Sequence, residues 1–492
     1  MRNRHIITAL LMLVSLTSHA ADTDSTLVEH TGLWQRVGEL SCQNPVLHGI
    51  AYRTTFSQLY LQADWQHQSL AFIPEKGDGY LLPAAHVDTY LRLNDHSTAW
   101  GHASYMNGQQ RHIRWNSTSD YDLLEPYILA DTVGGDTQHE RYVFEGGYAL
   151  HMDSWLIGAE MLFRADHEYR DIDPRMRGIA NELILRLGAS RQWCHYHWAF
   201  GFEGSVYKQR NTVEFYRELG VVPEYQMTGL GTDYARFSGD KRALQYDGGG
   251  VRLLFDVTPQ QKDDFFAHLA LGESRYHRMV TENYILPLTD LYTHSIEGRA
   301  GLMGPLSVYA DISYTKRSGD EHIIGTSATT SFPDLGVLTM YKNHRVNTSL
   351  TTIYAATHWQ IETRVGYQSD RQTYAYPEHC MNSTHAFAEL TGMTFHKPTN
   401  QMLLTCVLTV AHRHGLSSDL TMPFANMSSA FIEKARHTYA FAKADYTDLL
   451  AHLRCDYQLK DYGLFASIHA GYTTCSADAH QLSGRLSIGI TF

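Results

Sequence analysis

The sequence predicts an all-β protein, a transmembrane antiparallel up-and-down β-barrel of about 18 strands, within a range of about 14 to 18. Three observations predict this class. Apolar and polar residues alternate with a period of two over segments of roughly 10 to 15 residues, which is long for strands of soluble proteins. The connections between these segments are alternately long and short. The chain also ends in an alternating segment, "RLSIGITF", whose last residue is Phe492.

The amino terminus has the organisation of a secretory signal peptide. Arg2 and Arg4 precede an apolar run over residues 6–16, and Ser18 and Ala20 place small residues where a signal peptidase requires them. This run is too short to span a bilayer as a retained helix. The sequence therefore predicts a signal peptide over 1–20, a periplasmic or plug-like segment over 21–50 and an outer-membrane β-barrel over 51–492, in a bacterial outer membrane.

Composition excludes several classes of protein. The net charge of −12 argues against nucleic acid as a partner, because its phosphates require a basic surface. No Pro-rich or like-charge linker divides the chain, so one architecture of many similar units is expected. The six cysteines form no CxxC pair, and their wide spacing leaves both disulfides and unpaired thiols open.

Each predicted strand rests on alternation. From residue 155 onward, for example, one face carries Trp155, Ile157, Met161 and Phe163, while Glu160 lies on the other face. The predicted strands begin near Thr55, His86, Thr98, Glu140, Trp155, Asn181, Trp193, Arg242, Phe265, Leu291, Pro305, His344, His358, Asn382, Gln401, His437, Asp461 and Gly484.

The connections predict how the strands are arranged. The long ones cover 67–85, 117–139, 169–180, 209–241, 279–290, 319–343, 375–381, 414–436 and 475–483, and short ones such as 94–97 and 152–154 lie between them. A meander with short periplasmic turns at one end and long extracellular loops at the other has this pattern. A soluble β-sandwich also alternates, but its strands are shorter, and a propeller or β-helix requires a fixed repeat that is absent.

The last strand carries a candidate recognition signal. Its apolar face consists of Leu486, Ile488, Ile490 and Phe492. This pattern is typical of the signal that the barrel-assembly machinery reads, so this machinery and outer-membrane lipid are the expected partners. The alternative is a strand that simply ends in Phe.

Several phrases in the loops resemble an uncharacterised outer-membrane β-barrel family of Gram-negative, gut-type bacteria. They are "WGHASYMNGQQRHIRWN", "DLLEPYILADTVGGD", "EYRDIDPRMR" and "FYRELGVVPEYQMTGLGTDYARFSG". The resemblance implies an outer-membrane barrel and brings no substrate or catalytic residue. In the N-terminal segment, "QNPVLHG" resembles the Asn-Pro region of fatty-acid-transporter barrels over seven residues. A disordered tether before the first strand is the alternative there.

Charged residues on the polar face of the strands predict the lining of the lumen. Both signs are mixed, which suits an open aqueous channel as well as a network of ion pairs between neighbouring strands. The predicted lining residues are Glu160, Arg164, Asp166, Glu203, Arg252, Glu273, Arg275, Glu297, Arg299, Glu362 and Arg364.

Two loops and a histidine pair add further hypotheses. Loop 209–241, with Tyr216, Tyr225 and Tyr234, is expected to fold inward and narrow the pore, or else to cap the barrel outside. The acidic residues of loop 117–139 are a cation site or, more simply, solvated carboxylates. His195 and His197 are candidate metal ligands on one strand, if a third ligand lies nearby.

The function that follows is an outer-membrane channel or transporter for an unknown solute. The alternative is a plugged barrel that binds a partner, such as a surface lipoprotein or an uptake receptor. No GxSxG or HExxH motif is present, so we expect neither an enzyme nor a resident cofactor.

Overall fold

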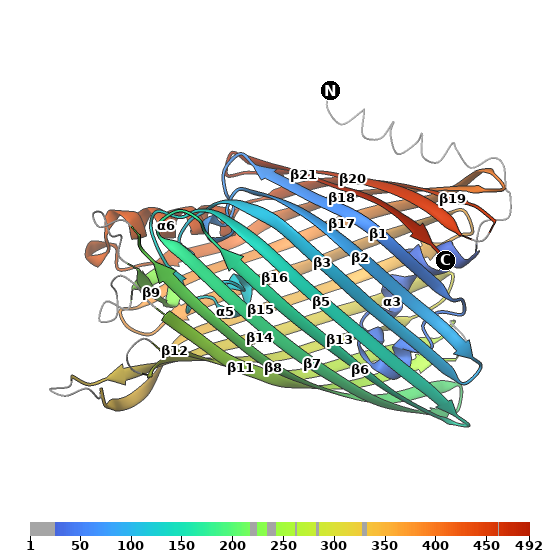
Figure 1. Cartoon of the computed structure of the whole chain (residues 1–492), viewed down its shortest axis with the longest axis horizontal. Coiled ribbons are helices and arrows are strands. Elements are labelled where there is room, and N and C mark those ends of the chain that lie inside the picture. The colour runs from blue at the N-terminus through green and yellow to red at the C-terminus, as the bar shows by residue number, and fades with distance from the viewer. Residues whose placement is uncertain are drawn as a thin grey trace.

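A closed antiparallel barrel of 18 strands dominates the structure, a computed structural model (Figure 1). It describes residues 25–216, 224–233, 243–260, 263–281, 285–326, 332–460 and 462–492. Each strand pairs with the next in the sequence, and the last barrel strand pairs with the first. The predicted fold class is therefore confirmed. The predicted signal peptide, residues 1–20, lies outside the described residues.

The barrel strands are long, between 13 and 22 residues. They are β1 (Phe56–Gln68), β2 (Gly79–Asn94), β3 (Ser97–Ile113), β5 (Gly135–Met152), β6 (Trp155–Tyr169), β7 (Arg175–Trp193), β8 (Tyr196–Glu214), β11 (Ala243–Pro259), β12 (Phe265–Val280), β13 (Leu286–Leu302), β14 (Leu306–Ile324), β15 (Asp334–Ala355), β16 (Trp359–Tyr374), β17 (His379–Thr399), β18 (Met402–Thr421), β19 (Tyr446–Gln458), β20 (Gly463–Cys475) and β21 (Ala479–Thr491).

Alternation along the strands turns apolar side chains outward. In β6, Trp155, Met161 and Phe163 are exposed on the exterior, whereas Leu156 and Glu160 are 2% and 4% exposed and face the interior. In a water-soluble protein this many exposed large apolar side chains would be destabilising. The exterior is instead a surface for hydrocarbon, and every strand pairs on both sides, so no backbone edge meets lipid.

The connections differ in length at the two ends of the barrel. Two-residue turns join β2 to β3, β5 to β6 and β7 to β8, and residues 69–78, 114–134, 215–242 and 422–445 connect strands at the opposite end. We call these the periplasmic and extracellular ends, following the rule for such barrels. The predicted loop 319–343 is shorter than expected, because β14 and β15 continue past the apolar band to residues 324 and 334.

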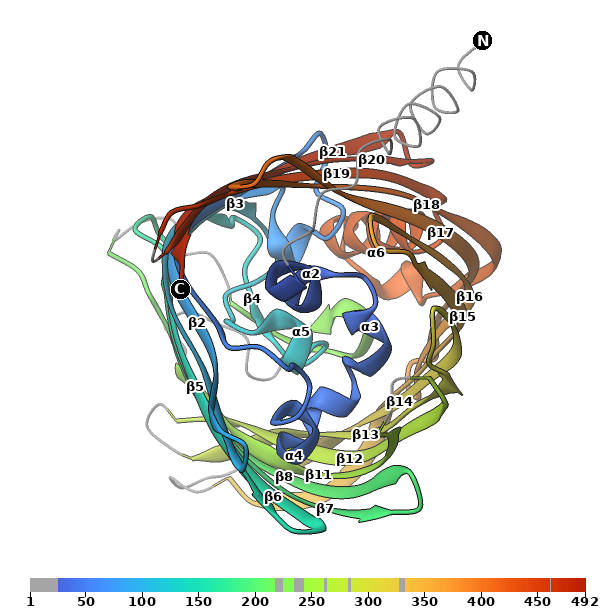
Figure 2. The same cartoon turned by 90° about the vertical axis from the view of Figure 1, so that its right-hand side faces the viewer.

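Short helices and a small second sheet lie with the barrel. Figure 2 shows α2, α3 and α4 inside the ring of strands. None of the helices in the described part of the chain is long and apolar enough to cross a bilayer. The elements are α2 (Ser25–Thr31), α3 (Gln35–Gly38), η1 (Ser41–Gln43), α4 (Pro45–His48), η2 (Pro74–Lys76), α5 (Tyr121–Leu124), β4 (Leu129–Ala130), β9 (Tyr225–Thr228), η3 (Gly229–Gly231), β10 (Thr232–Asp233), η5 (Phe424–Asn426) and α6 (Ser429–Ala442).

The strand predicted to begin at His437 is wrong at its start. His437 lies in helix α6, and β19 begins at Tyr446. Ser428 caps the helix, since its hydroxyl accepts a hydrogen bond from the backbone N–H of Phe431. Tyr439 and Phe441 are two residues apart, a spacing that is also typical of one face of a strand, but both lie in the helix.

Two apolar clusters fill parts of the interior. One joins Leu33 and Val37 of the N-terminal segment to wall residues such as Phe266 and Ile353. The other surrounds Leu129 and contains further buried residues of loops and strands at the extracellular end. All six cysteines lie within the described ranges, and no disulfide joins any two of them in this structure.

Candidate functional site

The lumen wall carries most of the predicted lining residues. Positions of inward parity hold Glu160, Arg164, Asp166, Glu203, Arg252, Glu297, Arg299, Glu362 and Arg364. Several of them form ion pairs between strands. Arg299 lies 2.5 Å from Asp311 on the adjacent strand β14, and Arg252 of β11 reaches across β12 to lie 2.5 Å from Glu297 of β13. Arg186 bridges Glu160 and Glu203 in the same way. The wall is thus a cross-strand network of paired charges.

Glu273 and Arg275 do not line the lumen. Both share the parity of Leu269 and Leu271, which are exposed on the exterior, while Ala270 of the opposite parity is buried. Beyond Leu271 strand β12 leaves the hydrocarbon, and its outward positions become polar. The charge of these two residues therefore indicates that they lie outside the hydrocarbon layer. It does not indicate that they face the lumen.

The N-terminal segment, residues 25–55, occupies the periplasmic half of the lumen (Figure 2). Arg36 forms an ion pair with Glu362 at 3.0 Å, and its backbone carbonyl accepts a hydrogen bond from Arg299. The backbone N–H of Leu33 donates to Gln360. Glu362 and Arg299, which the sequence predicts to line a pore, therefore bind the N-terminal segment instead.

Helix α4 docks on a row of three glycines. Gly158, Gly188 and Gly201 face the lumen and are direct neighbours across β6, β7 and β8. A methyl group on Gly188 would overlap the Asn44 side-chain oxygen. Asn44 caps α4 and donates to Asp256 at 3.1 Å, so the "QNPVLHG" stretch is also bound to the wall.

A loop that the sequence did not single out as inward-folding occupies the extracellular half of the lumen. We call residues 114–134 the inner loop. Its Asp131 pairs with Arg170 at 2.9 Å, and both side chains are 0% exposed. Asp120 pairs with Arg164 at 2.7 Å, and Glu125 lies 2.9 Å from Arg345.

Three carboxylates of the inner loop thus anchor it to the wall. Asp120, Glu125 and Asp131 each pair with an arginine. Tyr127 donates a hydrogen bond to Glu321, and burial, followed by this neighbouring carboxylate, raises the pKa of Tyr127 far above its ordinary range. Pairing of loop acids with wall arginines is invisible to alternation, so the sequence could not reveal this loop.

The predicted constriction loop has a mixed outcome. Tyr225 begins β9, which pairs with β4 of the inner loop, and its ring packs on Trp115 and Phe431. Tyr216 is instead 63% exposed and stacks on Arg175 at the rim, so it does not narrow the lumen. Tyr234 lies outside the described residues.

The predicted histidine pair is not a pair on one strand. His195 lies exposed in the two-residue turn between β7 and β8, with a positive φ of 111°, and only His197 lies on β8. The ring of His195 therefore does not follow the alternation of β8, which directs His197 inward. The lumen holds a different pair, since His452 and His469 face inward on adjacent strands and stack at 3.7 Å.

Three large cavities lie among the described residues of the barrel interior. The periplasmic cavity, of about 740 Å³, is lined by Arg36, His452, His469 and Arg485 among others. The central cavity, of about 830 Å³, is lined by Gln66, Arg141, Asp166 and Glu182 among others. The distal cavity, of about 700 Å³, is lined by Arg345, Asp370, His385 and Arg413 among others.

These cavities adjoin one another along the lumen. The periplasmic and central cavities share Tyr80, and the central and distal cavities share Phe72, Glu75 and Tyr121. Carboxylates predominate over cationic groups around the central cavity, where Glu75, Asp120, Asp122, Asp166, Glu168 and Glu182 face Lys76, Arg141 and Arg164. The three cavities therefore lie in a row beside the N-terminal segment and the inner loop, and the central cavity, at about 830 Å³ the largest of the three, has an acidic lining.

The seam of the barrel lies at the predicted assembly signal. Leu486, Ile488 and Phe492 are 56%, 54% and 65% exposed, and Ile490 has the same outward parity. The backbone N–H of Phe492 donates to the carbonyl of Ser57 at 2.9 Å. The apolar face of the last strand is thus presented outward where the two ends of the chain meet.

An apolar exterior, a closed ring of strands and a polar lumen define a bacterial outer-membrane β-barrel. The chain belongs to a family of unknown function (DUF6850), whose profile matches residues 45–492. This match begins inside "QNPVLHG", at the first residue of α4.

Comparison with solved structures finds other barrels at low identity. The ferric preacinetobactin receptor BauA from Acinetobacter baumannii shares 8% identity and a TM-score of 0.44, covering 90% of this chain and 80% of its own. The ferric yersiniabactin uptake receptor FyuA from Yersinia pestis shares 9% identity and a TM-score of 0.42, covering 89% and 80%. No curated protein matches the sequence.

Proposed function

We propose that the protein is a gated outer-membrane channel or transporter whose solute path is the chain of adjoining cavities. The single observation that supports it is the row of adjoining cavities beside the two segments that occupy the lumen. The N-terminal segment and the inner loop would act as the gate. Ion pairs between side chains hold both segments to the wall, and release of these pairs would let the segments move aside. The proposal assigns no catalytic step.

The solute that this path favours is cationic. Acidic groups predominate around the central cavity, and a low-dielectric wall strengthens their field. Purified protein in a planar bilayer with a salt gradient should therefore show gated openings whose reversal potential indicates a preference for cations. Asp122→Lys should reduce this preference, whereas Asp95→Lys, in the short β2–β3 turn away from the cavities, should not.

A closed barrel that binds a surface lipoprotein or an uptake receptor is the second candidate. The observation that favours it is the filling of both halves of the lumen by fastened segments. A variant that lacks residues 25–50 and carries a short Gly-Ser linker in place of residues 115–133 separates the two. With both halves of the lumen emptied, it should conduct strongly in either case and so shows that the barrel can pass ions. Silence of the intact chain beside a conducting deletion variant would contradict the channel proposal and favour the closed barrel.

A further inference from the structure

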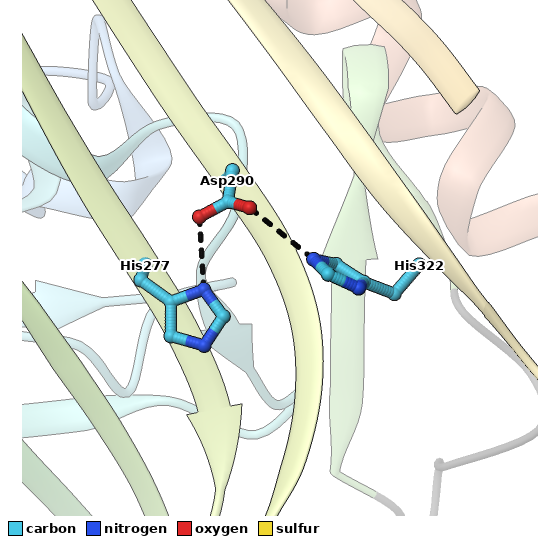
Figure 3. Close-up of side chains that lie close together, drawn as sticks. All are labelled: His277, Asp290 and His322. Atoms are coloured by element: carbon cyan, nitrogen blue, oxygen red, sulfur yellow. Dashed lines mark hydrogen bonds and ion pairs between the residues drawn. The ribbon is translucent and has the colours of Figure 1, made fainter. Parts of the chain in front are cut away.

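Three side chains converge on the exterior of the barrel at its extracellular end. His277 of β12, Asp290 of β13 and His322 of β14 point toward one another from three consecutive strands (Figure 3). Their potential ligand atoms all lie within 4.8 Å of one another. The cluster is separate from the lumen and its cavities.

The height of the cluster places it outside the hydrocarbon. His277 has the outward parity of Leu271 and lies six residues farther along β12, about 20 Å at the usual rise of a strand. Glu273 and Arg275, between them on the same face, are already polar. Solutes on the extracellular side therefore reach this position without entering the barrel.

The geometry points to a site for a divalent transition-metal ion, and we propose that His277, Asp290 and His322 are its ligands. His277 Nδ1 lies 2.8 Å from Asp290 Oδ1, and His322 Nε2 lies 3.2 Å from Asp290 Oδ2. Two imidazoles and one carboxylate are the donor set that suits zinc and its neighbours, whereas magnesium and calcium prefer oxygen ligands alone.

Hydrogen bonding at His322 supports the assignment independently. Its Nδ1 lies 2.7 Å from Asp334 Oδ2, and its Nε2 faces Asp290. The two ring nitrogens therefore face two different carboxylates. With a metal ion bound at Nε2, the Nδ1–H group would still donate to Asp334. A carboxylate behind the distal nitrogen is the usual support of a metal-binding histidine.

Burial leaves the site half open. Asp290 and His322 are 4% and 9% exposed, and the side chain of His277 is 27% exposed. An ion held by these three ligands would keep a position open toward solvent for water or an external ligand. It would also connect β12, β13 and β14 beyond the apolar band.

Arg275 competes with the ion. Its guanidinium lies 3.0 Å from Asp290 Oδ1 and already neutralises part of the carboxylate charge. Removal of this charge should strengthen metal binding, which is the opposite of what removal of a ligand does. Arg275 therefore offers a test in which a variant gains affinity.

Titration of the full-length chain in detergent with Co²⁺ and Zn²⁺ tests the proposal. Co²⁺ should give the absorption bands of a low-coordinate site at one equivalent, and Zn²⁺ should displace them. His277→Ala and His322→Gln should each weaken binding at least tenfold, and Arg275→Gln should strengthen it. His294→Ala is the matched control, because His294 is an exposed outward histidine on β13 that is not among the three ligands and should leave affinity unchanged.

The mobility of the unheated barrel on a gel shows that each variant is folded. Asp334→Asn adds a variant at a positioning residue, for which a weaker but measurable loss of affinity is expected with the same Co²⁺ spectrum. Equal Co²⁺ affinity and spectra in the wild type and in both folded histidine-ligand variants would overturn the proposal. The 29 histidines of the chain make the spectrum, and not retention on a metal column, the deciding measurement.

Discussion

Paired charges at the level of single residues determine which parts of the lumen are fixed. Arg170 and Asp131 are 0% exposed and lie 2.9 Å apart, whereas Lys76 and Asp122 form a 2.6 Å pair whose side chains are 44% and 73% exposed. The buried pair would leave an uncompensated charge if one partner were lost. The exposed pair is screened by water and contributes little.

Asp131→Asn should lower the free energy of unfolding by about 3–5 kcal/mol, because Arg170 then remains buried without its carboxylate. Urea denaturation of the protein in lipid vesicles measures this change. Asp122→Asn is the control, with an expected loss below about 1 kcal/mol. Equal losses in both variants would contradict the anchoring role of the buried pair.

The type of residue predicted which side chains face the lumen only where the strands cross the hydrocarbon layer. Glu160 and Arg164 were placed correctly by alternation, because the apolar neighbours on β6 fix the opposite face. Glu273 and Arg275 were not, because charge alone was taken to indicate the interior. Outside the hydrocarbon both faces of a strand are polar, so charge no longer distinguishes them. The His277, Asp290 and His322 cluster spans three strands and has no local spacing in the sequence.

At the scale of elements, α4 and its glycine row are the clearest fit between two parts of the chain. Three small residues in register on β6, β7 and β8 leave room for a helix that begins at Pro45. Glycine is unfavourable within strands unless another backbone approaches closely. The close approach of α4 is the reason for glycine at these positions.

Gly188→Leu should loosen the N-terminal segment, because the side chain would overlap Asn44. Overpacking of this kind costs about 1–3 kcal/mol. The rate of maleimide labelling of Cys42, in a chain whose other cysteines are serine, should rise at least fivefold. Gly146→Leu is the control, since a methyl group there meets nothing within 4 Å. Equal labelling rates in the two variants would show that the glycine row does not seat α4.

Strands were predictable from the sequence and the interior elements were not. Every barrel strand overlaps a predicted segment, because lipid on one side and water on the other impose a period of two. Helix α6 has a polar environment on part of its surface and no such constraint, and its ends depend on a local cap at Ser428. The inner loop is fixed by contacts between residues far apart in the sequence, such as Glu125 with Arg345.

For the molecule as a whole, Phe492 is expected to matter for assembly more than for stability. Its ring is 65% exposed, and its backbone bonds to Ser57 do not depend on the side chain. Phe492→Ala should reduce the amount of folded barrel in the outer membrane of cells several-fold. Refolding of the same variant into detergent should proceed as in the wild type. An equal defect in both assays would mean that the ring acts in folding itself and not in recognition by the assembly machinery.

The pairing of β1 with β21 also makes enclosure depend on two strands that are far apart in the sequence. The ring is complete only when these two strands meet. A polypeptide truncated by the 13 residues of β21 would keep seventeen strands and lose enclosure altogether.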